Sequence, residues 1–365
     1  MPRTGGGARQ AAPFVHDHDA MQHDVQEIVR RLDADDPLAL GRPAGWSVSR
    51  LEGRRYSSIH LLTAAATADT VRARTGSDTL VLKRYRSAQG DRRQREFEDL
   101  ERVWSALGEA GGAVRPVACY PELGALITAR AAGRSLAPLV RRAVAWTGDR
   151  ETLALAAAHC AAAGAWLRRF QTAGAPQVQG ARPPHLSDAA AFLAYVDERL
   201  RLLEHASPGI DTALRGRLLA HAASALQALS PRTFADVTWS HSDFGPHNIL
   251  AEPARLHVLD FELLPQHPCF DVAYFVECLH GHTGPWVDSA RVRRLERAFL
   301  AGYGEPLDPA YFALLRLRHL VCTYASEARR GGAAGWLRWR SRAALRARLR
   351  HVTSLLAMRT HARAA

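Results

Sequence analysis

Residues 241–262 limit the possible folds of this chain more than any other segment, because they read HSDFGPHNILAEPARLHVLDFE. Two apolar runs, residues 248–251 and 256–260, flank residues 252–255, whose Pro and polar residues are typical of a turn. The pattern predicts a β-hairpin. Since the two ends of a hairpin lie side by side, the residues at its start and at its end are expected to be close in space.

Three polar residues occupy this hairpin and the loop before it: Asp243, Asn248 and Asp260. This is the spacing of a phosphoryl-transfer centre, in which one Asp accepts the proton of the substrate hydroxyl and the other two residues hold Mg²⁺ ions that neutralise the phosphates of ATP. One Asn and one Asp, completed by water and phosphate, suit Mg²⁺. The alternative is an Asx-rich turn before a strand. That alternative requires the three residues, the hairpin and a separate lysine to coincide by chance.

The lysine is Lys83, in the β-rich run TLVLKRY of residues 79–85. Its apolar neighbours favour a position from which the ammonium group contacts the α- and β-phosphates of ATP; a solvated lysine on an edge strand is the alternative. A predicted helix over residues 91–107 offers a carboxylate partner. Glu96 borders the apolar stripe of that helix and is our choice, with Glu98 half a turn away.

The first third of the chain is rich in strands and the remainder is mostly helical, which predicts an α+β protein with two lobes. Residues 1–40 are expected to be a partly mobile N-terminal extension with one helix, 41–130 a β-rich ATP-binding lobe, and 131–365 a helical lobe with the catalytic loop and the acceptor site. Ligands favour the space between such lobes. The predicted strands are residues 46–51, 59–66, 79–85, 114–120 and 125–129, and the first predicted helix is residues 19–32.

The composition excludes several classes of protein. A hydrophobic content of 47% over 365 residues can fill a substantial core, and the longest apolar stretch, residues 153–167, is too short to span a membrane and predicts a buried helix. The N-terminus has no signal-peptide pattern, so a cytoplasmic location is expected. Five cysteines without a CxxC pair predict free thiols.

The net charge of +12 and the Arg-rich sequence after Arg291 permit attraction to anions. No recognised nucleic-acid-binding pattern accompanies this charge, so helices with a solvated basic face are the better interpretation. Nucleic acid is therefore not the expected partner. Nothing in the sequence indicates the oligomeric state.

The segments HSDFGPHNIL, VLDFE and PCFDVAYF resemble the HGDxxxxNIL, IDF/WE and DPxxDLA blocks of the aminoglycoside phosphotransferase and choline kinase superfamily. The resemblance covers about residues 51–302 and implies the bilobal protein-kinase-like fold of these small-molecule kinases. The resemblance implies that Asp243 is the catalytic base and that Asn248 and Asp260 are metal ligands. It also implies that His241 braces the loop and that Asp271 holds the catalytic loop from the following helix.

Other segments extend the resemblance. VLKRY and REFEDLERVW are similar to the lysine strand and glutamate helix of the superfamily, and GALITARAAGRSL to its hinge, so the backbone from Ala129 to Ala131 would meet the adenine. The phosphate loop, residues 52–58, holds one glycine, which leaves backbone N–H groups and the hydroxyls of Ser57 and Ser58 to contact phosphate. A plain turn remains the alternative there.

Two departures bear on function. Ser242 replaces the usual glycine of the superfamily, and only ten residues separate Asp260 from Asp271, which leaves no room for a long activation segment and favours a small-molecule acceptor. The expected activity is ATP-dependent O-phosphorylation of a metabolite, sugar, amino alcohol or antibiotic. The alternative is a nucleotide-binding regulatory protein with weak catalysis. Glu262 is a candidate contact to the acceptor, and the positive charge disfavours a polycationic one.

Overall fold

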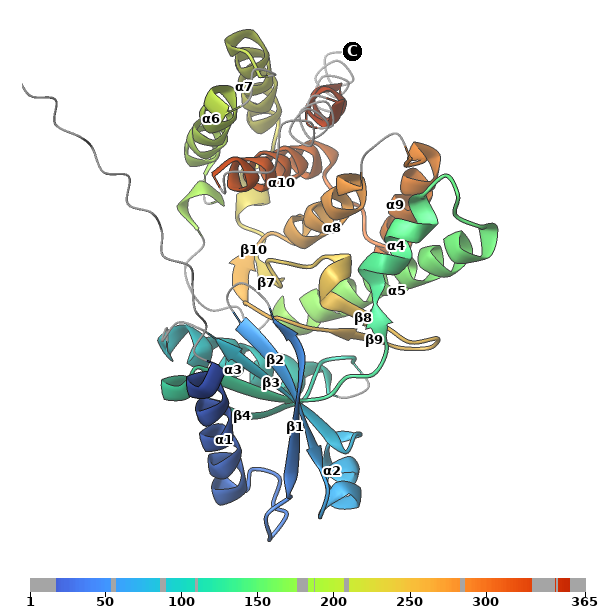
Figure 1. The fold of residues 1–365 in the computed structure, drawn as a ribbon. Helices are drawn as coiled ribbons and strands as arrows, with labels where there is room; N and C mark the ends of the chain where they lie inside the picture. The colour runs from blue at the N-terminus through green and yellow to red at the C-terminus, as the bar shows by residue number, and fades with distance from the viewer. Residues whose placement is uncertain are drawn as a thin grey trace, which may run out of the picture. The chain divides into compact units, whose positions relative to one another are not determined.

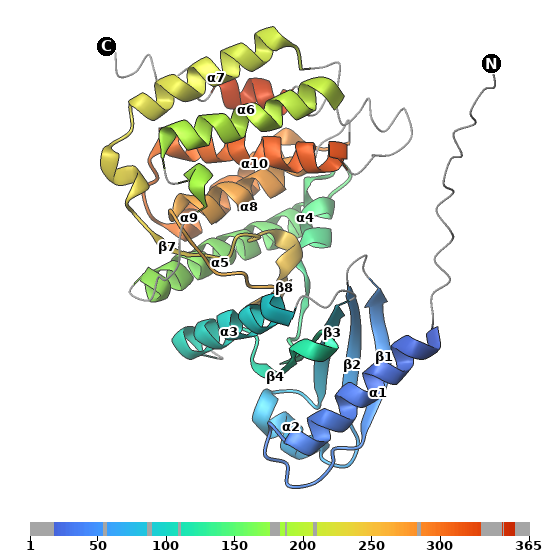
Figure 2. The ribbon, with the colours of Figure 1, turned by 90° about the vertical axis from the view of Figure 1, so that its left-hand side faces the viewer.

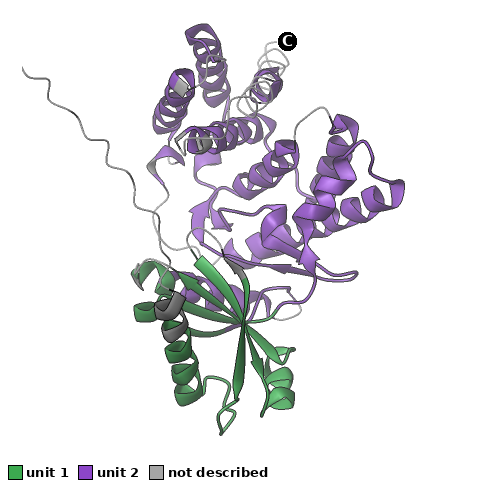
Figure 3. Ribbon diagram, in the orientation of Figure 1, with its two compact units in different colours: residues 1–94, 117–130 green, residues 95–116, 131–365 purple. Residues whose placement is uncertain are grey.

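The computed structural model describes residues 18–53, 57–85, 90–108, 111–175, 183–186, 188–206, 210–282, 286–329, 345 and 347–354. The chain divides into two compact units, shown in Figure 3. Unit 1 comprises residues 1–94 and 117–130, and unit 2 comprises residues 95–116 and 131–365. Residues 1–17, 54–56 of the predicted phosphate loop and 330–344 of the Arg-rich sequence lie outside the described residues.

Unit 1 is built on a five-stranded sheet with the strand order β1-β2-β3-β5-β4 (Figure 1). Neighbouring strands in the series β1, β2, β3 and β5 are antiparallel, and a shift in register between Arg50 and Glu52 marks an irregularity in β1. All five strands were predicted, with ends that differ by up to two residues. Their bounds are β1 Trp46–Gly53, β2 Ser57–Ala64, β3 Thr79–Tyr85, β4 Pro116–Tyr120 and β5 Ala125–Ala129.

Helix α1 (His18–Asp35) packs against this sheet (Figure 2). Val25 and Ile28 on its apolar stripe share one core with Leu62 of β2 and Leu80 of β3, as the helical periodicity of the sequence requires. Oδ1 of Asp33 accepts hydrogen bonds from the backbone N–H of Ala44 and from Nε1 of Trp46, both at 3.0 Å. The helix is therefore joined to the start of β1 as well as to the sheet.

Helix α2 (Ala68–Thr75) was not predicted. It is short and Val71 is its one buried residue, so it carries little amphipathic signal. Gly76 ends it with φ +77°, and its N–H donates to the carbonyl of Arg72. Gly76 is thus the C-terminal cap of this helix.

Unit 2 is mainly helical, which confirms the predicted α+β class with a β-rich N-terminal and a helical C-terminal region. One core lies among α4, α5, α8 and α9, and a second among α6, α7, α8 and α10, which lie side by side in Figure 2. The predicted buried helix 153–167 is the centre of α5. The helices are α3 Gly90–Leu107, of which residues 95–107 belong to this unit, α4 Leu136–Val144, α5 Arg150–Gly174, α6 Ala189–Ala206, α7 Thr212–Gln227, α8 Cys269–Gly281, α9 Ser289–Tyr303 and α10 Pro309–Arg329, with 3₁₀ turns at Pro184–Leu186, Pro231–Phe234 and Pro246–Asn248.

Short strands interrupt the helices. The predicted hairpin is confirmed as β8 (Ile249–Ala251) and β9 (Leu256–Val258), which pair antiparallel with Ile249 opposite Val258. Strand β6 (Arg134–Ser135) extends this pair to three strands. A second pair, β7 (Thr238–Ser240) with β10 (Leu264–Gln266), was not predicted.

Two further expectations concern the whole chain. All five cysteines are free thiols, as predicted, with Cys160 and Cys269 buried. Among the described residues, no helix combines the length and apolar character needed to cross a bilayer.

Glycines allow α5 and α9 to cross closely. A Cβ on Gly302 would lie 1.9 Å from the carbonyl oxygen of Ala161, which is backbone and cannot move aside alone. We expect Gly302→Ala to lower the free energy of unfolding by about 1–3 kcal/mol, because the two helices must separate. Chemical denaturation of both proteins measures the difference.

Gly216 of α7 provides the matched control, since a Cβ there meets nothing within 4 Å. Gly216→Ala is expected to stabilise the protein by about 0.5–1 kcal/mol through helix propensity. Equal effects of the two substitutions would contradict the proposed role of Gly302 at the crossing.

Candidate active site

The two predicted metal ligands lie at the same end of the β8/β9 hairpin. The N–H of Leu259 donates to the carbonyl of Asn248 over 2.9 Å, which continues the ladder one step beyond Ile249 and Val258. Asp260 follows Leu259 directly. Asp260 has φ +59°, a left-handed conformation that is costly for a residue other than glycine. Such conformations gather at functional sites, where the surrounding structure enforces them.

The carboxylate of Asp243 is held by side chains on both of its oxygens. Nδ2 of Asn248 donates to Oδ2 over 3.0 Å and to the backbone carbonyl of Asp243 over the same distance. Nε2 of His247 lies 3.3 Å from Oδ2, and the hydroxyl of Tyr274 donates to Oδ1. The side chain is still 52% exposed. A substrate hydroxyl can therefore reach a carboxylate whose orientation is already fixed.

The ionisation of Asp243 suits a proton acceptor. Burial by itself raises the pKa of this carboxyl, but the hydrogen bonds from His247 and Tyr274 outweigh it, and the net pKa lies below the ordinary value. Asp243 is thus ionised at neutral pH.

Asp271, at the start of α8, fixes the loop that carries Asp243. Its Oδ1 accepts from the hydroxyl of Ser240 at 2.9 Å and from the N–H of Ser242 at 3.0 Å, and its Oδ2 accepts from the N–H of His241 at 2.8 Å. The side chain is fully buried. Burial raises the pKa of Asp271 to about 6, against the lowering effect of these hydrogen bonds. One carboxylate thus holds the hydroxyl of Ser240 and the backbone N–H groups of the next two residues.

His241 links the same loop to the hairpin. Its buried ring donates through Nε2 to the carbonyl of Leu259 over 2.8 Å, and its Nδ1 accepts from the N–H of Asp243 over 3.4 Å. These two bonds require the neutral tautomer with the proton on Nε2. Burial also lowers the pKa of His241, which favours the neutral ring. The imidazole therefore joins Asp243 to the residue that precedes Asp260.

Aromatic rings pack around the loop that carries Asp243. Phe244 stacks on Trp166 of α5 with ring centroids 5.6 Å apart, and it packs against Phe275 of α8 at the same separation. The ring of Phe261 lies 4.8 Å from that of His241. Because Phe244 and Phe261 directly follow Asp243 and Asp260, the packing of each ring anchors the adjacent carboxylate.

Ser242 has φ +68°, which explains why glycine suits this position. Its hydroxyl donates to the carbonyl of Glu262 over 3.1 Å, so the serine gains a bond that glycine lacks. Both Ser242→Ala and Ser242→Gly lose that bond, but only the glycine relieves the backbone. We expect Ser242→Gly to be more stable than Ser242→Ala by about 1 kcal/mol in thermal unfolding. The opposite order would show that the left-handed conformation is not retained in solution.

The orientation of Asn248 fits a cation site. Both of its side-chain hydrogen bonds use Nδ2, so the amide oxygen is the atom left for a ligand, and the residue is 3% exposed. The described residues contain no group of three or more His, Cys, Asp or Glu side chains suited to a metal. One amide and one carboxylate oxygen fit Mg²⁺, which keeps several water or phosphate ligands.

The predicted nucleotide-binding residues are divided between the units. In unit 1, Lys83 lies on β3 between Ile59 and Leu126, with Nζ 5.0 Å from the centroid of the Tyr85 ring. Ser57 and Ser58 are buried on β2, where the hydroxyl of Ser58 contacts Nε2 of His60 at 2.9 Å. Ala129 is the last residue of β5. Glu96 and Ala131 belong to unit 2. Pairing of Lys83 with Glu96 stays a prediction.

Sequence reasoning missed two contacts of the candidate site. Asp99 of α3 is buried, and its Oδ2 accepts from the N–H of Leu263 over 2.9 Å, just after the hairpin. Tyr274 lies three residues after Asp271, on the same side of α8, and this spacing could have revealed it. Glu262 is exposed.

Comparisons with known proteins show the family and the fold of this chain. The model of the phosphotransferase enzyme family matches residues 58–318. A structure from Ralstonia eutropha JMP134, assigned to the aminoglycoside phosphotransferases, is 15% identical, with a TM-score of 0.58 over 92% of this chain and 98% of that one. A choline/ethanolamine kinase family protein from Mesorhizobium loti is 17% identical, with a TM-score of 0.53 over 91% of this chain and 95% of the other. The ethanolamine kinase of Plasmodium vivax is 12% identical, with a TM-score of 0.51 over 93% and 90%. No curated protein matches the chain.

The β-sheet of unit 1 and the helices of unit 2 have the kinase-like fold of these structures. The chain belongs to the phosphotransferase enzyme family.

Proposed function

We propose that the protein transfers the γ-phosphoryl group of ATP to a hydroxyl of a small molecule. The observation that carries this proposal is the carboxylate of Asp243, which is ionised, half exposed and held by Asn248 on the hairpin that also carries Asp260. The family supports phosphoryl transfer in general. The acceptor hydroxyl and the roles of single residues are the finer part of the proposal.

Asp243 would accept a hydrogen bond from the acceptor hydroxyl in place of His247 or Tyr274. As the hydroxyl oxygen bonds to phosphorus and the bond to the ADP oxygen breaks, the hydroxyl proton passes to Asp243. Asn248 keeps Oδ2 oriented during this step, and His241 and Asp271 keep the loop in place. Catalysis of this kind depends mostly on positioning and electrostatics.

Asn248 and Asp260 would hold Mg²⁺, which supplies positive charge against the phosphate oxygens. Lys83 would contact the α- and β-phosphates, Glu96 would position Lys83, Ser57 and Ser58 would lie along the phosphates, and the backbone at Ala129 and Ala131 would meet the adenine. A cytoplasmic location would supply the ATP.

The experiment incubates a metabolite extract with the protein and Mg-ATP and searches by mass spectrometry for compounds that gain one phosphate. Products that form with the native protein and not with Asp243→Asn support the proposal. Binding of Mg-ATP without formation of any such product would instead support the regulatory alternative, a nucleotide-binding protein without turnover.

A further inference from the structure

A group of cationic and aromatic side chains in unit 2 lies near Asp243 and is not used by the mechanism above. Arg318 of α10 and Arg199 of α6 both lie against the ring of Tyr195, with guanidinium carbons 5.5 and 4.6 Å from its centroid. The ring of His185 stacks on the ring of Tyr195, with 3.9 Å between the centroids. We call Arg318, Arg199, Tyr195, His185 and His319 the Arg318 cluster.

Both imidazoles of the cluster are neutral. The guanidinium of Arg318 has donors only, so Nε2 of His185 at 3.2 Å and Nδ1 of His319 at 3.1 Å must accept from it. Nε2 of His319 then donates to the carbonyl of Phe270 over 3.1 Å. Burial lowers the pKa of His185 to about 4 and that of His319 well below its usual value. The histidines orient Arg318 without adding or cancelling charge.

The charge of Arg318 is not balanced by a carboxylate. Among the described residues its polar partners are the two imidazoles, and its Nε atom is buried with no hydrogen-bond partner. Arg199 contacts Glu198, but that carboxylate is its sequence neighbour and is 58% exposed. A buried donor without a partner costs free energy, and two arginines on one ring repel each other. An anion at this place would remove both penalties.

The cluster connects directly to the candidate base. The ring of His319 lies 5.2 Å from that of Tyr274, centroid to centroid, and the hydroxyl of Tyr274 donates to Asp243. Phe270, on whose ring Arg318 lies at 4.9 Å, is on the same helix as Tyr274. One tyrosine and one imidazole therefore separate the carboxylate that would take the hydroxyl proton from the unbalanced guanidinium.

We propose that the Arg318 cluster binds an anionic group of the acceptor, a carboxylate, phosphate or sulfate, while the hydroxyl of the same molecule lies at Asp243. This inference depends on the proposed function, because it names the class of acceptor that the same site takes. It excludes acceptors whose only charge is positive. Arginine is suited to this role because its planar fork binds oxyanions with two parallel hydrogen bonds.

The test compares Arg318→Gln with Arg201→Gln, using the acceptors found in the extract experiment. Arg201 is the matched control, since it lies on α6, is 62% exposed and pairs with Asp197. We expect the phosphorylated compounds to be anionic before phosphorylation, and Arg318→Gln to raise their KM at least about 30-fold with kcat little changed, because the anionic group is remote from the reacting atoms. Arg201→Gln leaves KM unchanged. Arg318→Lys, which retains the charge, recovers part of the loss even if Arg318→Gln is less stable.

A second readout does not need turnover. Sulfate, titrated calorimetrically into protein saturated with Mg-ADP, should bind the native protein and Arg201→Gln and lose affinity in Arg318→Gln. Acceptors without an anionic group, or an unchanged KM in Arg318→Gln, overturn the inference and leave the proposed function intact. If no product depends on Asp243, the proposed function fails, and the sulfate titration alone then decides for or against an anion site at Arg318.

Discussion

Replacement of Asp243 by Asn should lower kcat by about 10²–10⁴-fold, the usual contribution of a positioned general base. Asparagine has nearly the same shape but cannot take the hydroxyl proton, and its amide nitrogen must face one of the donors on Tyr274, His247 or Asn248. The measurement is the rate of ADP release with the identified acceptor. Above pH 5 the native rate should not show the titration of Asp243, since its pKa is lowered.

Asp69→Asn is the control, because the side chain of Asp69 is fully exposed on α2. It should retain the native rate. A thermal unfolding curve of Asp243→Asn that matches the native one separates lost chemistry from lost structure. Turnover of Asp243→Asn within a factor of ten of the native protein would remove Asp243 from the role of base.

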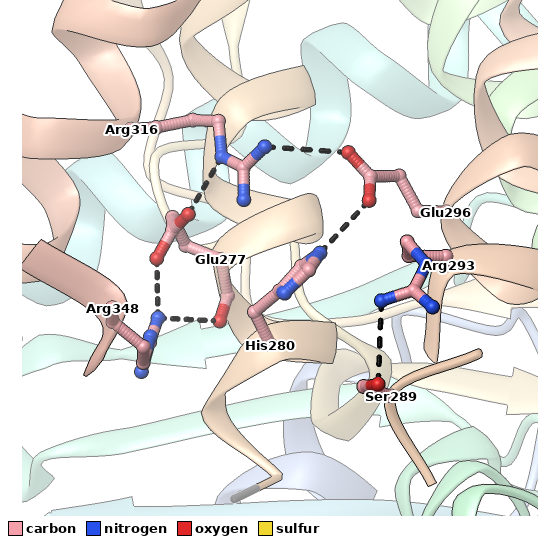
Figure 4. A network of polar contacts seen from close by, with 7 residues as sticks. All are labelled: Glu277, His280, Ser289, Arg293, Glu296, Arg316 and Arg348. Atoms are coloured by element: carbon pink, nitrogen blue, oxygen red, sulfur yellow. Dashed lines mark hydrogen bonds and ion pairs between the residues drawn. The ribbon is translucent and has the colours of Figure 1, made fainter. Parts of the chain in front are cut away.

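Replacement of Glu277 by Gln should destabilise the protein by about 3–5 kcal/mol, the effect of removing one partner from a buried ion pair. Glu277 of α8 lies between two arginines (Figure 4): Nε of Arg316 donates to Oε1 over 2.7 Å, and Nη2 of Arg348 donates to Oε2. All three side chains are at most 12% exposed. Glu296 also contacts Arg316, at 3.3 Å, but the variant leaves Arg348 without its carboxylate. Denaturant unfolding at neutral pH measures the loss.

The surface pair of Arg168 and Glu305 gives the comparison. Its two side chains are 41% and 44% exposed, so Glu305→Gln should cost no more than about 1 kcal/mol.

Burial alone raises the pKa of Glu277, but Arg348 and Arg316 outweigh it and lower the pKa to about 2. The stabilisation is therefore present above the unfolded pKa near 4.5 and is lost as the pH falls toward 2. The difference between native protein and Glu277→Gln should shrink as the pH falls from 5 to 3; a constant difference would contradict an ionic origin.

The sequence predicted those parts of the fold whose signals are local. The hairpin was predicted because a Pro-containing turn separates two apolar runs, and β3 because TLVLKRY is strongly β-forming. Helix α2 was missed because one buried residue makes no stripe. Strands β7 and β10 have three residues each and are defined by pairing across more than twenty residues, for which no local pattern exists.

The candidate site divides in the same way. The motif residues Asp243, Asn248 and Asp260 could be chosen from spacing, and the structure places Asn248 against Asp243. The contact of Arg318 with His185 depends on how α10 meets a turn 133 residues earlier in the chain, so no pattern in the sequence indicates it. Whether an arginine is balanced by a carboxylate is likewise a property of the packed structure.

Helix α8 carries Asp271, Tyr274 and Glu277 at intervals of three residues. Asp271 binds the loop before Asp243, Tyr274 binds the candidate base Asp243, and Glu277 binds Arg348 in the helix of residues 347–354. Residues 347–354 are consequently tied, through Arg348, to the same helix that holds the carboxylate of Asp243 through Tyr274. A chain that ends before Leu345 would lose the ion pair of Arg348 with Glu277 on α8. The activity of such a shortened chain should therefore not be taken as the activity of the full chain.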